Sequence, residues 1–145
     1  MITISQDTLR VALNAVTRAS QKTSSLPAFS LVRLDADTNG HLSLFCFNGE
    51  SAARAIVQVA CDEDLSVCVD AQTLNAVVET LAGPIQLSVE GNSFLLNSQA
   101  NRTTLRIVDE QLPVIGEESI QSLATISGAL LRSVLRVLPF ASTDG

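Results

Sequence analysis

Hydrophobic residues recur with helical spacing in three separate segments of the chain. Each set occupies positions i, i+3, i+4 and i+7, and the sets are Leu9, Ala12, Leu13 and Val16; Leu74, Val77, Val78 and Leu81; and Leu131, Val134, Leu135 and Leu138. This spacing places the members of each set on one face of a helix. Ser5, Asp70 and Ser127 each stand four residues before the first leucine, where a side chain can accept a hydrogen bond from a backbone amide at the helix start. The pattern therefore predicts three amphipathic helices of one design.

Between the predicted helices the pattern changes to that of strands. The expected strands are residues 28–36, 41–47, 51–60, 84–90, 93–99 and 103–108. Asn39-Gly40 separates the first two and Gly91-Asn92 separates the fourth from the fifth, and such dipeptides are typical of hairpin turns. A short β-branched run precedes each predicted helix. A unit of strand, helix and three strands is thus expected twice, which indicates an internal repeat.

Two such units predict an α+β fold in which helices pack on one face of antiparallel sheet. Residues 1–120 are expected to form one domain. Residues 121–145 contain a further strand and helix, so we interpret them as the beginning of an incomplete second domain. A chain cut inside a longer protein, or an engineered fragment, would end in this way.

The composition indicates a packed globular protein with an aliphatic interior, because 46% of the residues are hydrophobic, 17% are charged, and Trp and Tyr are absent. No apolar run approaches the roughly 20 residues of a membrane span. The first residues also lack the features of a signal peptide. We therefore expect a cytoplasmic protein without a membrane partner. Cys46, Cys61 and Cys68 form no CxxC motif and are expected to be buried free thiols.

The candidates for catalysis or metal binding are weak. His41 follows a hairpin turn without a nucleophile motif beside it, so we expect an exposed strand residue. Asp62, Glu63 and Asp64 lack the spacing and turn glycine of a calcium loop and are interpreted as a solvated connection. Phosphate-binding glycine motifs are absent from the sequence. We expect no enzyme activity, no metal and no cofactor.

Collinear segments along the chain resemble a known family. These segments are "SLPAFSLVRLDAD", "FNGES" and "VDAQTLNAVVETLAGPIQLSVEGNSFLLNSQANRTTLRIVDEQLPVI". They resemble the N-terminal domain of the bacterial sliding clamp, the β subunit of DNA polymerase III, over residues 1–120, and residues 121–145 resemble the start of its second domain. The resemblance implies the DNA-clamp fold and a non-enzymatic processivity factor for DNA replication.

The resemblance also implies partners for the full-length protein. Clamps of this family form a homodimeric ring around duplex DNA, with helices lining the hole and sheets forming the outer wall. They are placed by a clamp loader and tether the replicative polymerase. The partner groove of the family lies between the second and third domains, so this chain is not expected to contain it.

Sliding on DNA requires phosphate contacts without base readout, so basic and small polar residues are expected on the outer helix faces. Arg10, Asn14, Arg18 and Lys22 form a row at spacings of four opposite the apolar face of the first helix. Lys22, Thr23 and Ser24 open the loop that the family uses near DNA, and Arg132 and Arg136 occupy the equivalent positions on the third predicted helix. These residues are the candidate DNA contacts. The alternative is that they are ordinary charged residues on a solvent-exposed helix face, without a specific ligand.

Two features of the sequence weaken the inference to DNA. The second predicted helix carries Gln72, Asn75 and Glu79 where family members often have basic residues. The net charge of −6 also argues against nonspecific coating of nucleic acid by bulk charge. A divergent clamp-like scaffold without DNA binding therefore stays open as an alternative, and a small enzyme on a clamp-like fold is a more remote one.

The last predicted strand of the first domain is a candidate subunit interface. Thr103, Leu105 and Ile107 alternate on one face of a strand whose free edge could pair with another chain. In the family this edge meets the third domain of the other subunit, and that domain is missing here. Alternatively, Leu105 and Ile107 face the core of their own domain.

Overall fold

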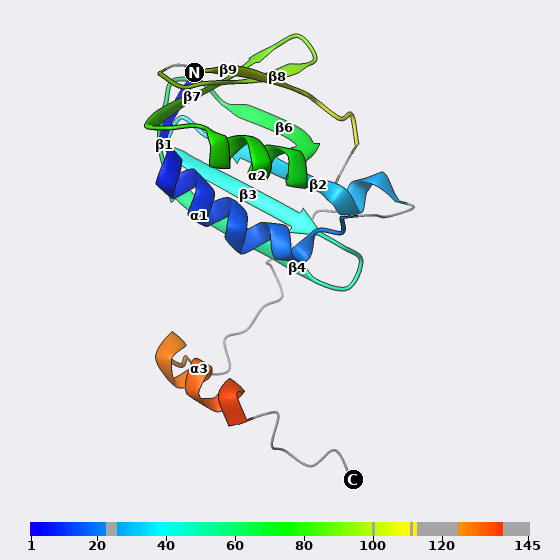
Figure 1. Cartoon of the computed structure of the whole chain (residues 1–145), viewed down its shortest axis with the longest axis vertical. Helices are drawn as coiled ribbons and strands as arrows, with labels where there is room; N and C mark the ends of the chain where they lie inside the picture. The colour runs from blue at the N-terminus through cyan, green and yellow to red at the C-terminus, as the bar shows by residue number, and fades with distance from the viewer. Residues whose placement is uncertain (23–25, 100, 111, 113–124, 138–145) are drawn as a thin grey trace. The chain divides into compact units, whose positions relative to one another are not determined.

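The computed structural model describes residues 1–22, 26–99, 101–110, 112 and 125–137. The chain divides into two compact units, Met1–Pro113 and Val114–Gly145. The strands are β1 (Ile2–Ser5), β2 (Leu31–Ala36), β3 (His41–Phe47), β4 (Ala52–Gln58), β5 (Ala60–Cys61), β6 (Leu65–Asp70), β7 (Pro84–Glu90), β8 (Ser93–Asn97) and β9 (Arg102–Arg106). The helices are α1 (Gln6–Val16), α2 (Ala71–Thr80) and α3 (Gly128–Val137), with short 3-10 helices η1 (Thr17–Ala19) and η2 (Pro27–Ser30) (Figure 1).

All three predicted helices begin at their predicted caps. The Ser5 hydroxyl accepts a hydrogen bond from the Thr8 amide at 3.1 Å, and Asp70 accepts one from the Thr73 amide at 2.8 Å. The Ser127 hydroxyl accepts from the Leu130 amide at 3.2 Å. Each bond satisfies one of the backbone donors that a helix start leaves without an intrahelical partner.

The strands of the first unit form two antiparallel sheets, in the orders β5-β1-β7-β8-β9 and β4-β3-β2-β6. The first strand of each repeat pairs with one strand of the other repeat, and β1 also pairs with β5. Ile4 of β1 lies opposite Ile85 of β7, and Val69 of β6 lies opposite Val32 of β2. The predicted α+β class with antiparallel sheet is confirmed, and the two repeats are joined by this exchange of strands.

The prediction of one strand over residues 51–60 is wrong, because the chain changes sheets at Val59. The Val59 amide donates to the Gly40 carbonyl at 2.8 Å, which ends the ladder with β3, and Ala60 then lies opposite Thr3 of β1. Gly40 has a φ of +85°, and a Cβ there would lie 2.9 Å from the Val59 carbonyl oxygen. A side chain at residue 40 would therefore be strained and would meet the switch point.

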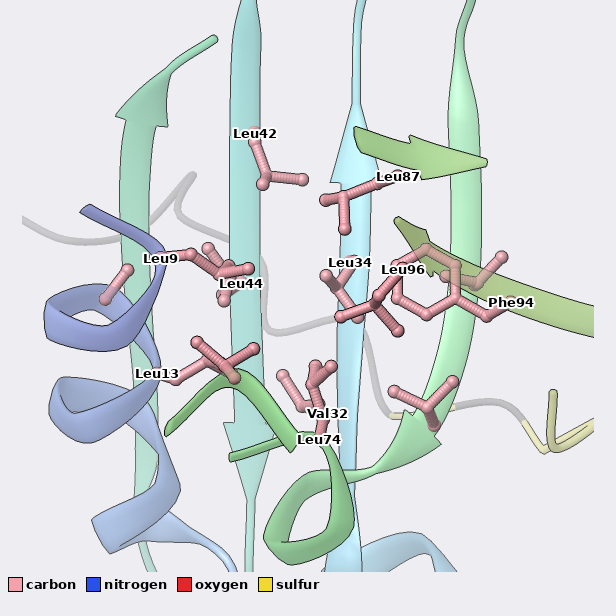
Figure 2. Packing of buried hydrophobic residues seen from close by; sticks show 14 of the residues in the cluster. Leu9, Leu13, Val32, Leu34, Leu42, Leu44, Leu74, Leu87, Phe94 and Leu96 are labelled. Atoms are coloured by element: carbon pink, nitrogen blue, oxygen red, sulfur yellow. The ribbon is translucent and has the colours of Figure 1, made fainter. Parts of the chain in front are cut away.

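One hydrophobic core joins both sheets to α1 and α2, which lie side by side over the four-stranded sheet (Figure 1). Figure 2 shows leucines of both helices among residues of both sheets. The labelled residues are Leu9, Leu13, Val32, Leu34, Leu42, Leu44, Leu74, Leu87, Phe94 and Leu96. The predicted apolar face of α1 is fully buried, and that of α2 is buried except for Val77, which is half-buried against the core.

The third predicted apolar face has a different environment. Leu131, Val134 and Leu135 of α3 are 45%, 50% and 49% exposed. Leu138, the fourth predicted member, lies outside the described residues. The helix and its cap are confirmed.

Candidate nucleic-acid interface

The outer face of α1 presents two of the predicted DNA contacts. Arg10 and Asn14 are exposed, while Leu9 and Leu13 on the opposite face are fully buried. The Arg10 guanidinium lies 3.0 Å from the Asp7 carboxylate, one turn earlier. Asp7 therefore offsets part of the charge that Arg10 offers to an anion, although solvent screens this exposed pair.

The predicted row of four residues at helical spacing is wrong after Asn14, because α1 ends at Val16. Arg18 belongs to η1, and Ser20 is extended, with φ −108° and ψ 154°. The Gln21 amide donates to the Phe29 carbonyl at 2.7 Å, which ties the chain to η2. Arg18 and Lys22 remain exposed, but their spacing no longer places them on one helical stripe with Arg10.

The other candidate contacts lie elsewhere. Thr23 and Ser24 lie outside the described residues. Arg132 and Arg136 are exposed on α3, which belongs to the second unit. The described first unit thus offers three basic candidates from the predicted set.

The outer positions of α2 carry no positive charge. Gln72 donates through Nε2 to the Ser20 hydroxyl at 3.2 Å, which links α2 to the turn after α1. The Asn75 Oδ1 is buried without a hydrogen-bond partner among the described residues, and Glu79 is exposed. The sequence pattern did not reveal the link through Gln72, because its partner lies 52 residues away.

The predicted interface strand is the edge of the five-stranded sheet, but its apolar face is turned inward. Leu105 is 8% exposed in the main core, and Ile107 packs against that core just beyond β9. Thr103 is half-buried. Leu105 and Ile107 therefore face the core of their own domain, which was the alternative expectation. Pairing of this edge with a second chain stays a prediction.

The acidic connection contributes to structure. The Met1 ammonium group lies 2.7 Å from a Glu63 carboxylate oxygen, and this hydrogen bond lowers the pKa of Glu63 and raises that of the amine. Asp64 accepts a hydrogen bond from the Thr38 amide at 3.0 Å. The sequence predicted solvated residues here, and it did not reveal that the amino terminus is a partner.

His41 is exposed, as predicted, and its backbone amide donates to Asp37, which lowers the pKa of that carboxyl group. Within residues 1–22, 26–99 and the other described ranges, no group of three His, Cys, Asp or Glu side chains could hold a metal ion. In the same part of the chain, no helix is both long and apolar enough to cross a membrane.

Comparison with known proteins defines the class of fold. The match with β subunits of bacterial DNA polymerase III covers 99% of this chain, with TM-scores of 0.86 for Caulobacter crescentus, 0.88 for Streptococcus pyogenes and 0.86 for Pseudomonas aeruginosa. The sequence identities are 21%, 19% and 24%. This chain therefore has the fold of the part of these β subunits that it matches, and the resemblance predicted from the sequence is confirmed at the level of the fold.

The match covers less than half of each of these larger proteins. The chain spans 40% of the Caulobacter crescentus and Streptococcus pyogenes subunits and 41% of the Pseudomonas aeruginosa subunit. No family model matches the sequence, and a comparison with curated proteins finds no relative.

Proposed function

We propose that this chain is part of a DNA polymerase processivity factor, a sliding clamp that encircles duplex DNA during replication. The observation that carries the proposal is the fold match with DNA polymerase III β subunits over 99% of the chain. Residues 1–120 would be a clamp domain, and residues 121–145 would begin a second one. The ring, the homodimer, the clamp loader and the polymerase would involve the longer protein, which would be cytoplasmic and would work without catalysis.

DNA contact would come from exposed cations at and after α1. Arg10, Arg18 and Lys22 are exposed, and long basic side chains contact phosphates without reading bases. Asn14 would add a neutral polar contact. Arg132 and Arg136 would play the same part on the second unit, with Thr23 and Ser24 in the loop after Lys22.

A clamp-like scaffold without DNA binding is the second candidate. Glu79 is exposed on α2, and Arg10 shares its charge with Asp7 at 3.0 Å. Both features lower the positive potential of the helix layer that would face DNA.

The salt dependence of duplex binding separates the two candidates. We expect the affinity of the chain to fall as salt rises, and Arg18→Gln to reduce the slope of log K against log salt by about 0.9, the value for one lost phosphate contact. Asp7→Asn should strengthen binding, since Arg10 then loses its carboxylate partner. The matched control is Arg102→Gln on β9, which should leave the slope unchanged. Arg102 is exposed on the five-stranded sheet, whereas α1 and α2 cover the four-stranded sheet, and it pairs with Glu90 at 3.3 Å.

Fluorescence anisotropy measures these slopes with a labelled 20-base-pair duplex. The protein concentration is kept in a range where sedimentation shows a single species. Equal reductions of the slope in Arg18→Gln and Arg102→Gln, or no salt-dependent binding by the chain, would favour the scaffold.

The ring itself is tested with a protein that contains this chain and the further clamp domains. Retention on closed circular DNA after loading, and loss on linearisation, is the expected result, and equal failure on both forms would contradict a topological clamp.

A further inference from the structure

The backbone that leads into Lys22 is fixed by hydrogen bonds. Ser20 follows η1, and its amide and its hydroxyl both donate to the Thr17 carbonyl, at 3.1 and 2.7 Å. The Gln21 amide donates to the Phe29 carbonyl at 2.7 Å. The Lys22 side chain is exposed, so a solvent-facing cation stands directly after a stretch of chain that is held in place.

Gln72 connects this stretch to α2. Its Nε2 donates to the Ser20 hydroxyl oxygen at 3.2 Å, in a partly buried contact. The Ser20 hydroxyl already donates its own proton to the Thr17 carbonyl, so its oxygen can only accept a hydrogen bond from residue 72. The contact therefore requires a side chain with an N–H donor at this position of α2.

Gln21 makes a second connection, to the turn between β3 and β4. Its Nε2 donates to the Asn48 carbonyl at 3.3 Å. The Asn48 side chain stabilises that turn, because its Oδ1 accepts hydrogen bonds from the amides of Glu50 and Ser51 at 3.0 and 2.8 Å. The acceptor for Gln21 is thus held by the hydrogen bonds of the turn itself.

Phe29, whose carbonyl accepts the Gln21 amide, is held by aromatic packing. Its ring centroid lies 5.7 Å from that of Phe47 at an interplanar angle of 84°, the favourable edge-to-face arrangement. Gly49 leaves room for this ring, since a Cβ at residue 49 would lie 2.9 Å from the Phe29 Cζ. The chain just before Lys22 is therefore held by α2, by the turn between β3 and β4, and by η2.

We infer that Gln72 and Gln21 are positioning residues for Lys22, because they fix the backbone next to this lysine before DNA binds. A contact group that is already ordered loses less conformational freedom on binding, which increases the affinity. The inference rests on the proposed function, in which Lys22 contacts a phosphate of duplex DNA. Both glutamines are neutral, so their effect should appear in the affinity and not in its salt dependence.

The first test compares Gln72→Leu with Lys22→Gln by fluorescence anisotropy on a labelled duplex at several salt concentrations. Leucine retains a high helix propensity but cannot donate to Ser20. We expect Gln72→Leu to weaken binding about fivefold at every salt concentration, the effect of one hydrogen bond of ordinary strength, with an unchanged slope. Lys22→Gln should reduce the slope by about 0.9. The matched control is Gln86→Leu, at an exposed position of β7 in the five-stranded sheet, which should change neither quantity.

A double-mutant comparison separates positioning from a general loss of structure. In the Lys22→Gln background, Gln72→Leu should change the affinity by less than about twofold, because the cation to be positioned is gone. In the Arg10→Gln background the fivefold effect should persist, because Arg10 lies on α1, outside the held stretch. Gln21→Leu should show the same pattern as Gln72→Leu.

Trypsin cleavage after Lys22 measures the holding of this stretch without DNA. Cleavage requires the chain to open locally, and its rate follows the open population when opening and closing are fast. Gln72→Leu should raise the initial rate of cleavage after Lys22 about fivefold, the same hydrogen-bond effect. Cleavage after Arg102, on β9, should be unchanged, and mass spectrometry of the fragments distinguishes the two sites.

Two results would overturn the inference. One is an unchanged rate of cleavage after Lys22 in Gln72→Leu, and the other is an equal loss of affinity from Gln72→Leu in the unmodified and Lys22→Gln backgrounds. Absence of salt-dependent binding by the unmodified chain would instead contradict the proposed function, and the cleavage rates would then decide alone whether Gln72 holds this stretch. Circular dichroism verifies that each variant is folded. Ser20→Ala, which removes the acceptor of the same bond, replaces Gln72→Leu if that variant is unfolded.

Discussion

A break in the chain between Glu63 and Asp64 tests whether the two repeats depend on each other's strands. These residues are exposed in the bend between β5 and β6, so the break itself removes no buried side chain. The first fragment keeps β1 to β5 with α1, and the second keeps β6 to β9 with α2 and α3. The first fragment loses β7, one of the two neighbours of β1, and keeps the two-residue β5; the second fragment loses β2, the neighbour of β6.

The loss can be sized from four buried side chains. Ile2, Ile4, Val67 and Val69 are 0%, 4%, 6% and 0% exposed, and they lie on the two exchanged strands. Exposing one such side chain costs about 1.5–3 kcal/mol, so each fragment, which holds two of the four, loses roughly 3–6 kcal/mol. A domain has a free energy of unfolding of about 5–15 kcal/mol. We therefore expect both fragments to be unfolded when separate.

The assay compares each fragment with an equimolar mixture. Far-ultraviolet circular dichroism and urea titration should show no cooperative transition for either fragment, and the mixture should regain one that depends on concentration. The control is the intact chain with a protease site inserted in the same bend, measured before and after cleavage. A fragment that unfolds cooperatively by itself would refute the reasoning, because it would show that a repeat is stable without the exchanged strand.

Two smaller changes test local features. Asp70→Ala removes the cap of α2 and should lower the free energy of unfolding by about 1 kcal/mol, which moves the urea midpoint down by roughly 0.3–1 M. Asp70→Asn should retain most of the stability, and an equal loss in both variants would contradict the capping role. Burial raises the pKa of Cys46 to about 12, so the Cys46 thiol stays protonated at pH 8. Iodoacetamide reacts with thiolates, so in the folded chain at pH 8 it should label the half-buried Cys61 before the buried Cys46. Equal labelling rates, read by peptide mass mapping, would show that Cys46 is accessible.

The features that the sequence predicted correctly depend on neighbours within a few residues. The caps at Ser5, Asp70 and Ser127 bond to amides three residues later, and the apolar faces of α1 and α2 follow from helical spacing. The errors arise at long-range contacts. The chain leaves α1 early as Gln21 bonds to Phe29, and the predicted strand through residue 60 breaks as Ala60 moves to the other sheet.

The candidate site divides in the same way. Spacing along α1 predicted that Arg10 and Asn14 share an outer face, and both are exposed. The pairing of Arg10 with Asp7 is also within reach of sequence reasoning, because residues three apart meet on a helix. The sequence left open whether the face with Leu105 meets its own core or another chain, because alternation shows which residues share a face but does not identify the surface that covers that face.

The sequence by itself determined where the three helices begin, which helix faces are apolar, and that one unit occurs twice. The tertiary structure decided that β1 joins the second repeat and β6 the first, and so which strands became the open edges. The physical reason is that an alternating strand specifies which side chains face the core but does not specify its neighbour. Backbone hydrogen bonds are the same for every strand, so the neighbour is selected by how side chains distant in sequence fill one shared core.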